Sequence, residues 1–128
     1  MTGDRRAASP VAGDVAVLDW GGQHGVTSFV VGQDEPVLAG HYPGFPIFPG
    51  VCLVECAHRS AGAFAARAGR RLRLTCVEST RFLAPVFPGD EVLTRMRVQE
   101  VEGGWRCRAE LSVGERPVAT VRLRMEAP

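Results

Sequence analysis

The clearest pattern of apolar and polar positions lies near the end of the chain, where residues 118–125 alternate. Such alternation is typical of an antiparallel strand that has one face on a core and the other in water. The apolar face would carry Ala119, Val121, Leu123 and Met125, and the opposite face Val118, Thr120, Arg122 and Arg124.

Similar runs predict further strands, each bounded by turn residues. The strand-like segments are residues 14–20, 25–31, 73–86, 91–102, 105–113 and 117–126. The turns between them read GGQH (21–24), FPGD (87–90), EGG (102–104) and GERP (114–117). Because tight turns join consecutive strands, the pattern favours antiparallel pairing.

One segment predicts a helix, residues 51–68, which Gly69 would close. Its first half is apolar nearly all round, so we expect most of its sides to be buried. One long helix and about six strands predict an α+β fold in which a curved antiparallel sheet wraps around a single central helix. The open edges of such a sheet favour pairing with another copy, which predicts a dimer.

Length and composition describe a single globular domain. The chain has 128 residues, 45% of them hydrophobic, and a net charge of +1. We expect a flexible tail over residues 1–12 and one domain over residues 13–128. The balanced charge gives no reason to expect nucleic acid or an acidic membrane as a partner, and no apolar run reaches the ~18 residues of a membrane span.

The four cysteines indicate a reducing compartment. They lack CxxC spacing, and the polar N-terminal residues do not resemble a secretory signal, so we expect free thiols in the cytoplasm. Cys52 and Cys56 share one helical face near His58, but a metal would need more ligands. We therefore expect these cysteines to be small buried apolar residues and predict no metal site.

The stretch GHYPGFPIFPGVCLVECAHRSAG, residues 40–62, carries the candidate chemistry. Glu55 falls in the apolar half of the predicted helix, where burial would favour the protonated carboxylic acid and suit a general acid. The alternative is an ion pair with Arg59, one helical turn later.

Two further residues of this stretch are candidates. His41 precedes a loop that three prolines stiffen, which would hold its ring still, although a histidine with a purely structural role in a rigid turn is the alternative. Gly50 stands at the start of the helix, where unpaired backbone N–H groups suit an anion or a polarised carbonyl oxygen. Base, acid and oxyanion donor together predict proton abstraction beside a carbonyl.

The same stretch resembles a known signature. GHYPGFPIFPGVCLVECA is similar to the pattern G-H-F-P-G-x-P-x-x-P-G-V-x-x-x-E-A of the β-hydroxyacyl-acyl-carrier-protein dehydratases, which have the hot-dog fold. A second block, RFLAPVFPGDEV at residues 81–92, resembles that family's R-F-x-x-P-V-x-P-G-D. The resemblance spans residues 13–126 or so.

The resemblance implies a function and a site. It implies dehydration of a 3-hydroxyacyl thioester to the trans-2-enoyl thioester in fatty-acid, polyketide or polyene biosynthesis, with the acyl chain on the phosphopantetheine arm of an acyl carrier protein. His41 of one subunit would take the α proton, and Glu55 of the other would protonate the departing hydroxyl. The N–H groups at Gly50 and Val51 would bind the thioester oxygen. The resemblance implies no metal and no redox cofactor.

The departures from the family pattern leave alternatives open. Arg59 stands where the family commonly has glutamine, and its charge would weaken Glu55 as an acid. An N-terminal motif near L-P-H-R-Y-P is absent, so the chain resembles divergent dehydratases of polyketide or polyene assembly, which act as homodimers or pair with a related hot-dog subunit. An acyl thioesterase and a non-catalytic subunit silenced by Arg59 remain alternatives. Arg70, Arg71 and Arg73 are candidates to meet an acidic carrier protein or are simply a solvated helix end.

Overall fold

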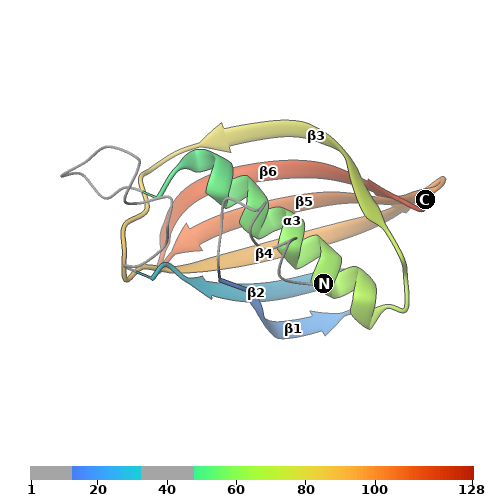
Figure 1. The fold of residues 1–128 in the computed structure, drawn as a ribbon, viewed down its shortest axis with the longest axis horizontal. Coiled ribbons are helices and arrows are strands. Elements are labelled where there is room, and N and C mark those ends of the chain that lie inside the picture. The colour runs from blue at the N-terminus through green and yellow to red at the C-terminus, as the bar shows by residue number, and fades with distance from the viewer. Residues whose placement is uncertain (1–12, 33–47) are drawn as a thin grey trace, which may run out of the picture.

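The computed structural model describes residues 13–32 and 48–128, which form six strands and one helix (Figure 1). The predicted tail over residues 1–12 and most of the proline-rich loop, including His41, lie outside the described residues. The elements are β1 (Ala16–Gly21), β2 (His24–Val30), α3 (Gly50–Arg67), β3 (Arg73–Phe82), β4 (Glu91–Val101), β5 (Gly104–Val113) and β6 (Arg116–Glu126).

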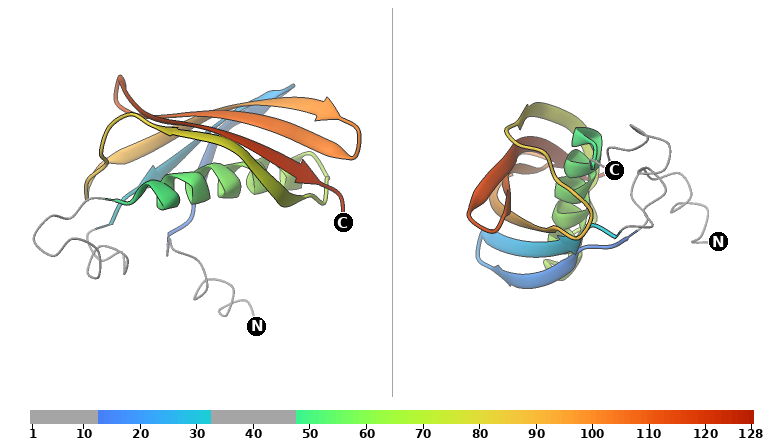
Figure 2. Two further views of the ribbon diagram at one scale, coloured as in Figure 1. Left: turned by 90° about the horizontal axis from the view of Figure 1, so that it is seen from above. Right: turned by 90° about the vertical axis from the view of Figure 1, so that its left-hand side faces the viewer.

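The strands form one antiparallel sheet in the order β1-β2-β4-β5-β6-β3. The sheet curves around α3, which lies along its concave face (Figure 2). The predicted α+β architecture is therefore confirmed. β3 follows α3 in sequence and forms the edge of the sheet beside β6, so α3 takes the chain from β2 across the concave face to the opposite edge.

All four predicted turns contain a glycine in the left-handed region of backbone space. Gly89, in FPGD, has φ +90°, and Gly103, in EGG, has φ +85°. Because residues with a Cβ rarely adopt these angles, glycine at these positions fixes where one strand ends and the next begins.

The core fills the space between α3 and the concave face of the sheet. Inward residues of β4, β5 and β6 alternate with outward polar residues, as the sequence pattern predicts. The assignment of Val118 to the polar face is wrong, because its side chain is fully buried. The pairing of β5 with β6 shifts register between Leu111 and Ser112, so Val118 stands as an extra residue that breaks the alternation.

The helix differs from the expected one at its first turn. It begins at Gly50, and the side chain of Val51 is 61% exposed although the surrounding sequence is apolar. Cys52, Leu53, Cys56 and Ala57 are buried against the sheet, as expected. The expectation that the first half of the helix is covered on nearly every side is thus wrong for the single chain, because the sheet covers one face of α3 only.

The cysteines separate into two environments. Cys52, Cys56 and Cys107 are buried, whereas Cys76 on β3 is exposed. The expected burial of Cys52 and Cys56 is confirmed. Burial also raises the pKa of the Cys107 thiol to about 12, which keeps it protonated and unreactive at neutral pH.

Candidate functional site

Polar contacts on the buried side of α3 fix its position under the sheet. The Ser60 hydroxyl donates to the carbonyl oxygen of Cys56 at 2.7 Å, and its oxygen lies 2.7 Å from the Thr27 hydroxyl of β2. Both side chains are fully buried, so neither hydroxyl can exchange its partner for bulk water. This pair sets the rotation of α3 and thereby which of its residues face away from β2.

The start of α3 is held by the residue two positions before it. Phe48 is buried, its ring lies 5.8 Å from that of Phe29, and its N–H donates to the carbonyl oxygen of Val86 at 2.7 Å. Pro49 then serves as the N-cap and provides no side-chain hydrogen bond to the helix. The position of the first turn of α3 is therefore fixed, and the side chain of Pro49 accepts no hydrogen bond from its backbone N–H groups.

Gly50 has a packing role that its position in the sequence does not reveal. A Cβ built at Gly50 would lie 2.8 Å from the ring of Phe82, the last residue of β3. The absence of a side chain therefore allows β3 and the first turn of α3 to approach closely. The glycine is explained by this contact as well as by any access that it gives to the backbone N–H.

Glu55 lies one turn into the helix, and its neighbours contact both carboxylate oxygens. Arg59 Nε donates to Oε2 at 3.1 Å, and His58 Nδ1 lies 3.2 Å from Oε1. The ion pair with Arg59 that the spacing allowed is thus present. The Glu55 side chain is 22% exposed, so it is partly buried rather than enclosed by apolar residues.

Arg59 connects Glu55 to the segment that leads into β1. Its Nη1 donates to the carbonyl oxygen of Gly13 and lies 3.5 Å from a carboxylate oxygen of Asp14. The Arg59 side chain is only 15% exposed. One guanidinium therefore orients the Glu55 carboxylate and holds the N-terminal segment against α3.

The structure brings some of the predicted site residues together. Gly50, Val51, Glu55 and Arg59 all lie in the first ten residues of α3, and Glu55 is about 7.5 Å along the helix axis from Gly50. His41 lies outside the described residues, so its distance from these four is not part of the described structure.

Arg70, Arg71 and Arg73 follow the opposite end of α3. Arg70 donates to Glu100 and lies 5.8 Å over the ring of Trp105, so this arginine has partners within the chain. Within one chain, the three arginines do not lie beside Gly50.

Two contacts of the site were missed by sequence reasoning. The i, i+3 spacing of Glu55 and His58 was a usable signal, but His58 was considered only as a metal ligand. The contact between Arg59 and Gly13 joins residues 46 positions apart, and no local pattern marks it. Among the described residues, no cluster of three or more histidine, cysteine, aspartate or glutamate side chains has an arrangement suited to a metal ion.

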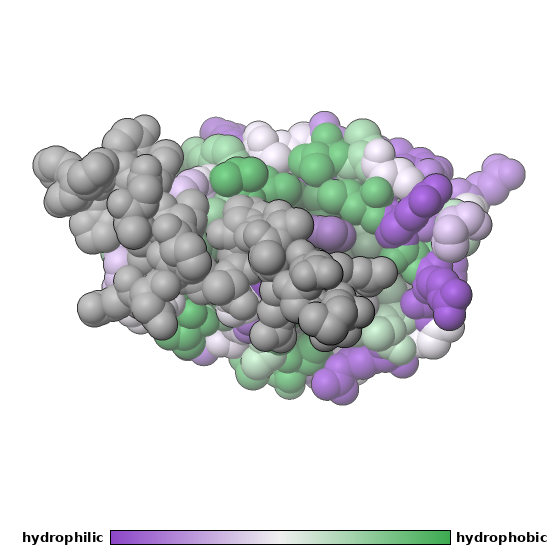
Figure 3. All heavy atoms as spheres, viewed as in Figure 1, coloured by the Kyte–Doolittle hydropathy of each residue, from purple (hydrophilic) through white to green (hydrophobic). Residues whose placement is uncertain are grey.

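Apolar side chains reach the surface beside this region. On the face that carries α3, hydrophobic residues gather at the surface over α3 and β3 (Figure 3). Val51, Phe82 and Leu83 are all exposed near the start of the helix and the end of β3, with Phe82 at 51%. α3 itself is not apolar enough over its length to span a membrane.

A family model matches most of the chain. It is described as ApeI-like, ApeI dehydratase, and it matches residues 19–120. The chain belongs to this dehydratase family. The predicted relationship to hot-dog dehydratases is thus confirmed.

Curated relatives agree with this assignment. The 3-hydroxyacyl-[acyl-carrier-protein] dehydratase FabZ of Verminephrobacter eiseniae is 32% identical over 70% of this chain and 65% of its own length. FabZ of Pasteurella multocida is 30% identical over 68% of this chain and 69% of its own length. FabZ of Rhizobium rhizogenes is 36% identical, and the match covers 60% of that protein. The matches thus cover 60% to 69% of the length of these relatives.

Solved structures share the fold at low sequence identity. A structure described as the dehydratase heterocomplex ApeI:P from Xenorhabdus doucetiae matches with a TM-score of 0.71 and 18% identity, over 88% of this chain and 80% of the other. The protein smu.793 from Streptococcus mutans, bound to acetyl CoA, matches with a TM-score of 0.75 and 15% identity over 94% of both chains. At these identities the likeness shows the hot-dog fold alone.

Proposed function

We propose that this protein removes water from a 3-hydroxyacyl thioester carried on an acyl carrier protein and yields the trans-2-enoyl thioester. The membership in a dehydratase family and the FabZ relatives support this activity. The observation that carries the assignment to this chain is Glu55, which α3 presents partly buried and oriented through both carboxylate oxygens.

The elimination needs a base, an acid and a group that stabilises negative charge on the thioester oxygen. His41 takes the proton from the α carbon, and the electron pair forms the new double bond as the C3–O bond breaks. Glu55 gives its proton to the departing hydroxyl, which leaves as water. The N–H groups at Gly50 and Val51 face the thioester oxygen as it gains negative charge. The step uses no metal and no redox cofactor.

Arg59 and His58 act on this chemistry through Glu55. Two neighbours on one helix restrict the carboxylate to one orientation, and a well-oriented catalytic group lowers the entropy cost of reaching the transition state. Arg59 is thus a positioning residue that stands where relatives commonly have glutamine. The alternative, an Arg59 that silences Glu55, predicts a chain without activity of its own.

The partners follow from the same assignment. The substrate arrives on an acyl carrier protein in the cytoplasm, and the working unit is a dimer in which His41 of one subunit faces Glu55 of the other. β3 supports such a dimer, because it is an edge strand with exposed residues and pairs on one side only among the described strands. Its free backbone groups can pair with a strand of a second subunit. The second subunit is another copy of this chain or a related hot-dog subunit.

Intact mass of the carrier protein tests the activity. The purified protein is mixed with a short 3-hydroxyacyl carrier protein, and we expect the acyl carrier to lose the mass of one water. Glu55→Gln and His41→Ala should each lower the rate by about 10²–10⁴-fold, which is the usual contribution of a general acid or base. Glu115→Gln removes an exposed carboxylate on the turn between β5 and β6 and is the matched control.

The same measurement separates the alternatives. Release of the free acid instead of water would identify a thioesterase. If the chain shows no mass change alone but gains activity with an unlike hot-dog subunit, and Glu55→Gln leaves that activity intact, this chain is the non-catalytic partner. Light scattering of the purified chain, alone and with that subunit, decides between a homodimer and a heterodimer.

A further inference from the structure

The convex face of the sheet carries arginines in direct opposition. Arg97 of β4 pairs in register with Arg108 of β5, and Arg108 pairs with Arg122 of β6. All three side chains point away from the core, because their neighbours in sequence are buried. We call Arg97, Arg108 and Arg122 the arginine row.

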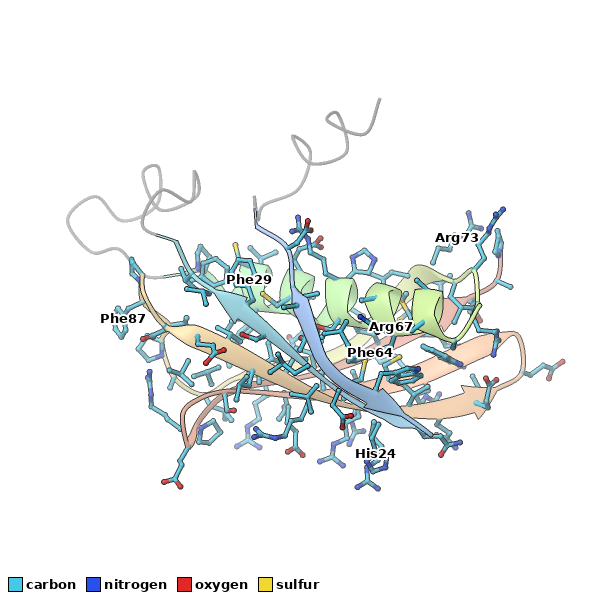
Figure 4. All side chains as sticks on the ribbon, turned by 90° about the horizontal axis from the view of Figure 1, so that it is seen from below. His24, Phe29, Phe64, Arg67, Arg73 and Phe87 are labelled. Carbon is cyan, nitrogen blue, oxygen red and sulfur yellow. The ribbon has the colours of Figure 1, made fainter. Side chains whose placement is uncertain are left out.

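The row continues as polar residues on the flanking strands. His24 of β2 lies opposite Arg97, and Ser79 of β3 lies opposite Arg122. His24 is on the side of the sheet away from α3, whereas Arg67 belongs to α3 on the other side (Figure 4). The row therefore crosses the middle of the sheet on the face opposite Glu55.

This arrangement costs stability in the absence of a ligand. Like charges directly opposite each other on neighbouring strands destabilise a sheet. Nearby arginines on the same sheet have acidic partners: Arg106 donates to both carboxylate oxygens of Glu78 at 3.1 and 3.2 Å, and Arg124 donates to Glu126 at 3.1 Å.

The members of the row are neutralised weakly or not at all. The side chains of Arg97 and Arg122 make no ion pair or hydrogen bond in the described part of the chain, and only their backbones are bonded to neighbouring strands. Arg108 lies 3.9 Å from Glu110, and both side chains are exposed, so that pair contributes little. The sheet thus holds three adjacent cations with little compensating charge.

The surface is hollowed on both sides of the row. One cavity of ≈ 480 Å³ is lined by Arg97, Arg106, Arg108 and Arg122 together with Ser79 and Gln99. A second, of ≈ 400 Å³, is lined by His24, Arg95, Arg97 and Arg108. Volumes of this order suit small molecules.

We propose that the arginine row binds a small anion that carries two or three linked phosphate groups. Guanidinium groups match phosphate oxygens with paired hydrogen bonds, and neighbouring strands hold the three Cα atoms about 5 Å apart, so the long side chains of all three arginines can converge on one short chain of phosphates. Central strands hold these positions before the ligand arrives, which lowers the entropy cost of binding.

Other occupants fit the surface less well. A second copy would present the same arginine row, and two such rows repel. An extended acidic protein surface would meet Asp19, Glu78 and Glu110, which also line the hollows, whereas a short polyanion can lie along the arginine row itself. The charge pattern therefore favours a compact ligand.

Titration calorimetry of the full chain in low-salt buffer tests the proposal with inorganic triphosphate and with ATP. We expect triphosphate to bind, and Arg97→Gln/Arg122→Gln to weaken it by about tenfold or more, since two hydrogen-bonded charges are lost. The matched control, Arg67→Gln/Arg71→Gln, removes two exposed arginines near the end of α3 and should bind like the parent. Equal affinities identify the phosphate chain as the ligand, and tighter binding of ATP identifies a nucleotide.

Melting temperatures of the parent and the variants show whether each variant is folded. Without ligand, Arg97→Gln/Arg122→Gln should melt at the same temperature as the parent or higher, because repulsion within the row is relieved. If that variant fails to fold, Arg108→Gln alone takes its place. Absence of triphosphate and ATP binding by the folded parent, or equal binding by the row variant, would overturn the proposal.

Discussion

The two halves of α3 meet the rest of the molecule in different ways. In the second half, Phe64 (labelled in Figure 4) is fully buried. Its ring stacks on that of Trp20, with centroids 4.8 Å apart and an 11° angle between the planes. In the first half, Val51 is exposed and Glu55 is surrounded by polar partners. The second half stabilises the domain, whereas the first half presents groups that stability alone does not require.

The tight packing of the second half depends on a residue of another element. A Cβ built at Gly25 of β2 would lie 2.3 Å from the Phe64 ring, so the ring occupies the space that any other residue at position 25 would need. The first half of α3 contains no phenylalanine, tyrosine or tryptophan that could make a comparable contact with β2. The difference teaches that one helix can serve as core at one end and as a scaffold for chemistry at the other.

Removal of the Phe64 ring should have the largest effect. Phe64→Ala leaves a cavity under Trp20, and we expect the free energy of unfolding to fall by about 3–5 kcal/mol in urea denaturation. Arg67→Ala, in the same last turn but exposed, is the control and should stay within about 0.5 kcal/mol of the parent. A loss for Phe64→Ala no larger than that of the control would show that the buried ring does not stabilise the domain.

Filling the space beside the ring should come next. Gly25→Ala forces Phe64 or β2 to move, and we expect a loss of about 1–3 kcal/mol. Gly62→Ala is the matched control, and its expected effect has the opposite sign. A Cβ at this position would have nothing within 4 Å, and alanine favours a helix. We therefore expect the free energy of unfolding to rise by about 0.5–1 kcal/mol.

The same contact predicts a dependence between two substitutions. Phe64→Leu introduced with Gly25→Ala should cost less than the sum of the two single changes, because the smaller side chain makes room for the new methyl group. Strict additivity in denaturation experiments would contradict the close approach.

Arg59 tests the first half of the helix. Arg59→Gln removes the contacts to Glu55 and Gly13, and we expect a loss of about 1 kcal/mol in the free energy of unfolding, the typical net contribution of one hydrogen bond in a protein. The loss should shrink in a Glu55→Gln background, since the two residues share one interaction. Arg71→Gln provides the exposed control, and an effect of Arg59→Gln no larger than this control would show that Arg59 holds nothing in place.

The smallest expected effect is a pH-dependent contribution of Glu100 to stability, near the C-terminal end of α3. The Trp105 indole N–H, which donates to Glu100 at 2.8 Å, and Arg70 hold the pKa of the Glu100 carboxyl below its usual value of 4.5. The ionised form is therefore favoured by folding, so this contribution is present above the ordinary pKa and is lost as the pH falls through the lowered one.

Melting curves check that sign. Glu100→Gln should melt slightly below the parent at neutral pH, and the gap should close toward pH values of about 3. A gap that widens on acidification would contradict the direction of the shift.

Most of the fold could be predicted because its signals are local. Glycine turns such as the one at Gly103 set the strand ends to within a few residues, and alternation identified the inward face of β6. The burial of Val118 was not predicted, because a register shift depends on the partner strand. The proximity of Gly25 to Phe64 was not predicted either, because this contact exists only after β2 and α3 have packed together.

The sequence names candidate residues for the site but not the contacts that these residues make. The spacing of Glu55 and Arg59 allowed an ion pair as the alternative to a buried acid, and the motif placed Gly50 at the helix start. The contacts of Phe82 with Gly50 and of Arg59 with Gly13 needed the folded chain, because they join distant segments.

The position of Cys76 gives the molecule a natural reporter. Since the other cysteines are buried, a thiol-reactive dye should label this residue alone on the folded chain. It lies on the edge strand that would meet a second subunit. A fluorophore attached there would change its emission whenever that strand becomes covered, so assembly can be followed in real time without any engineered cysteine.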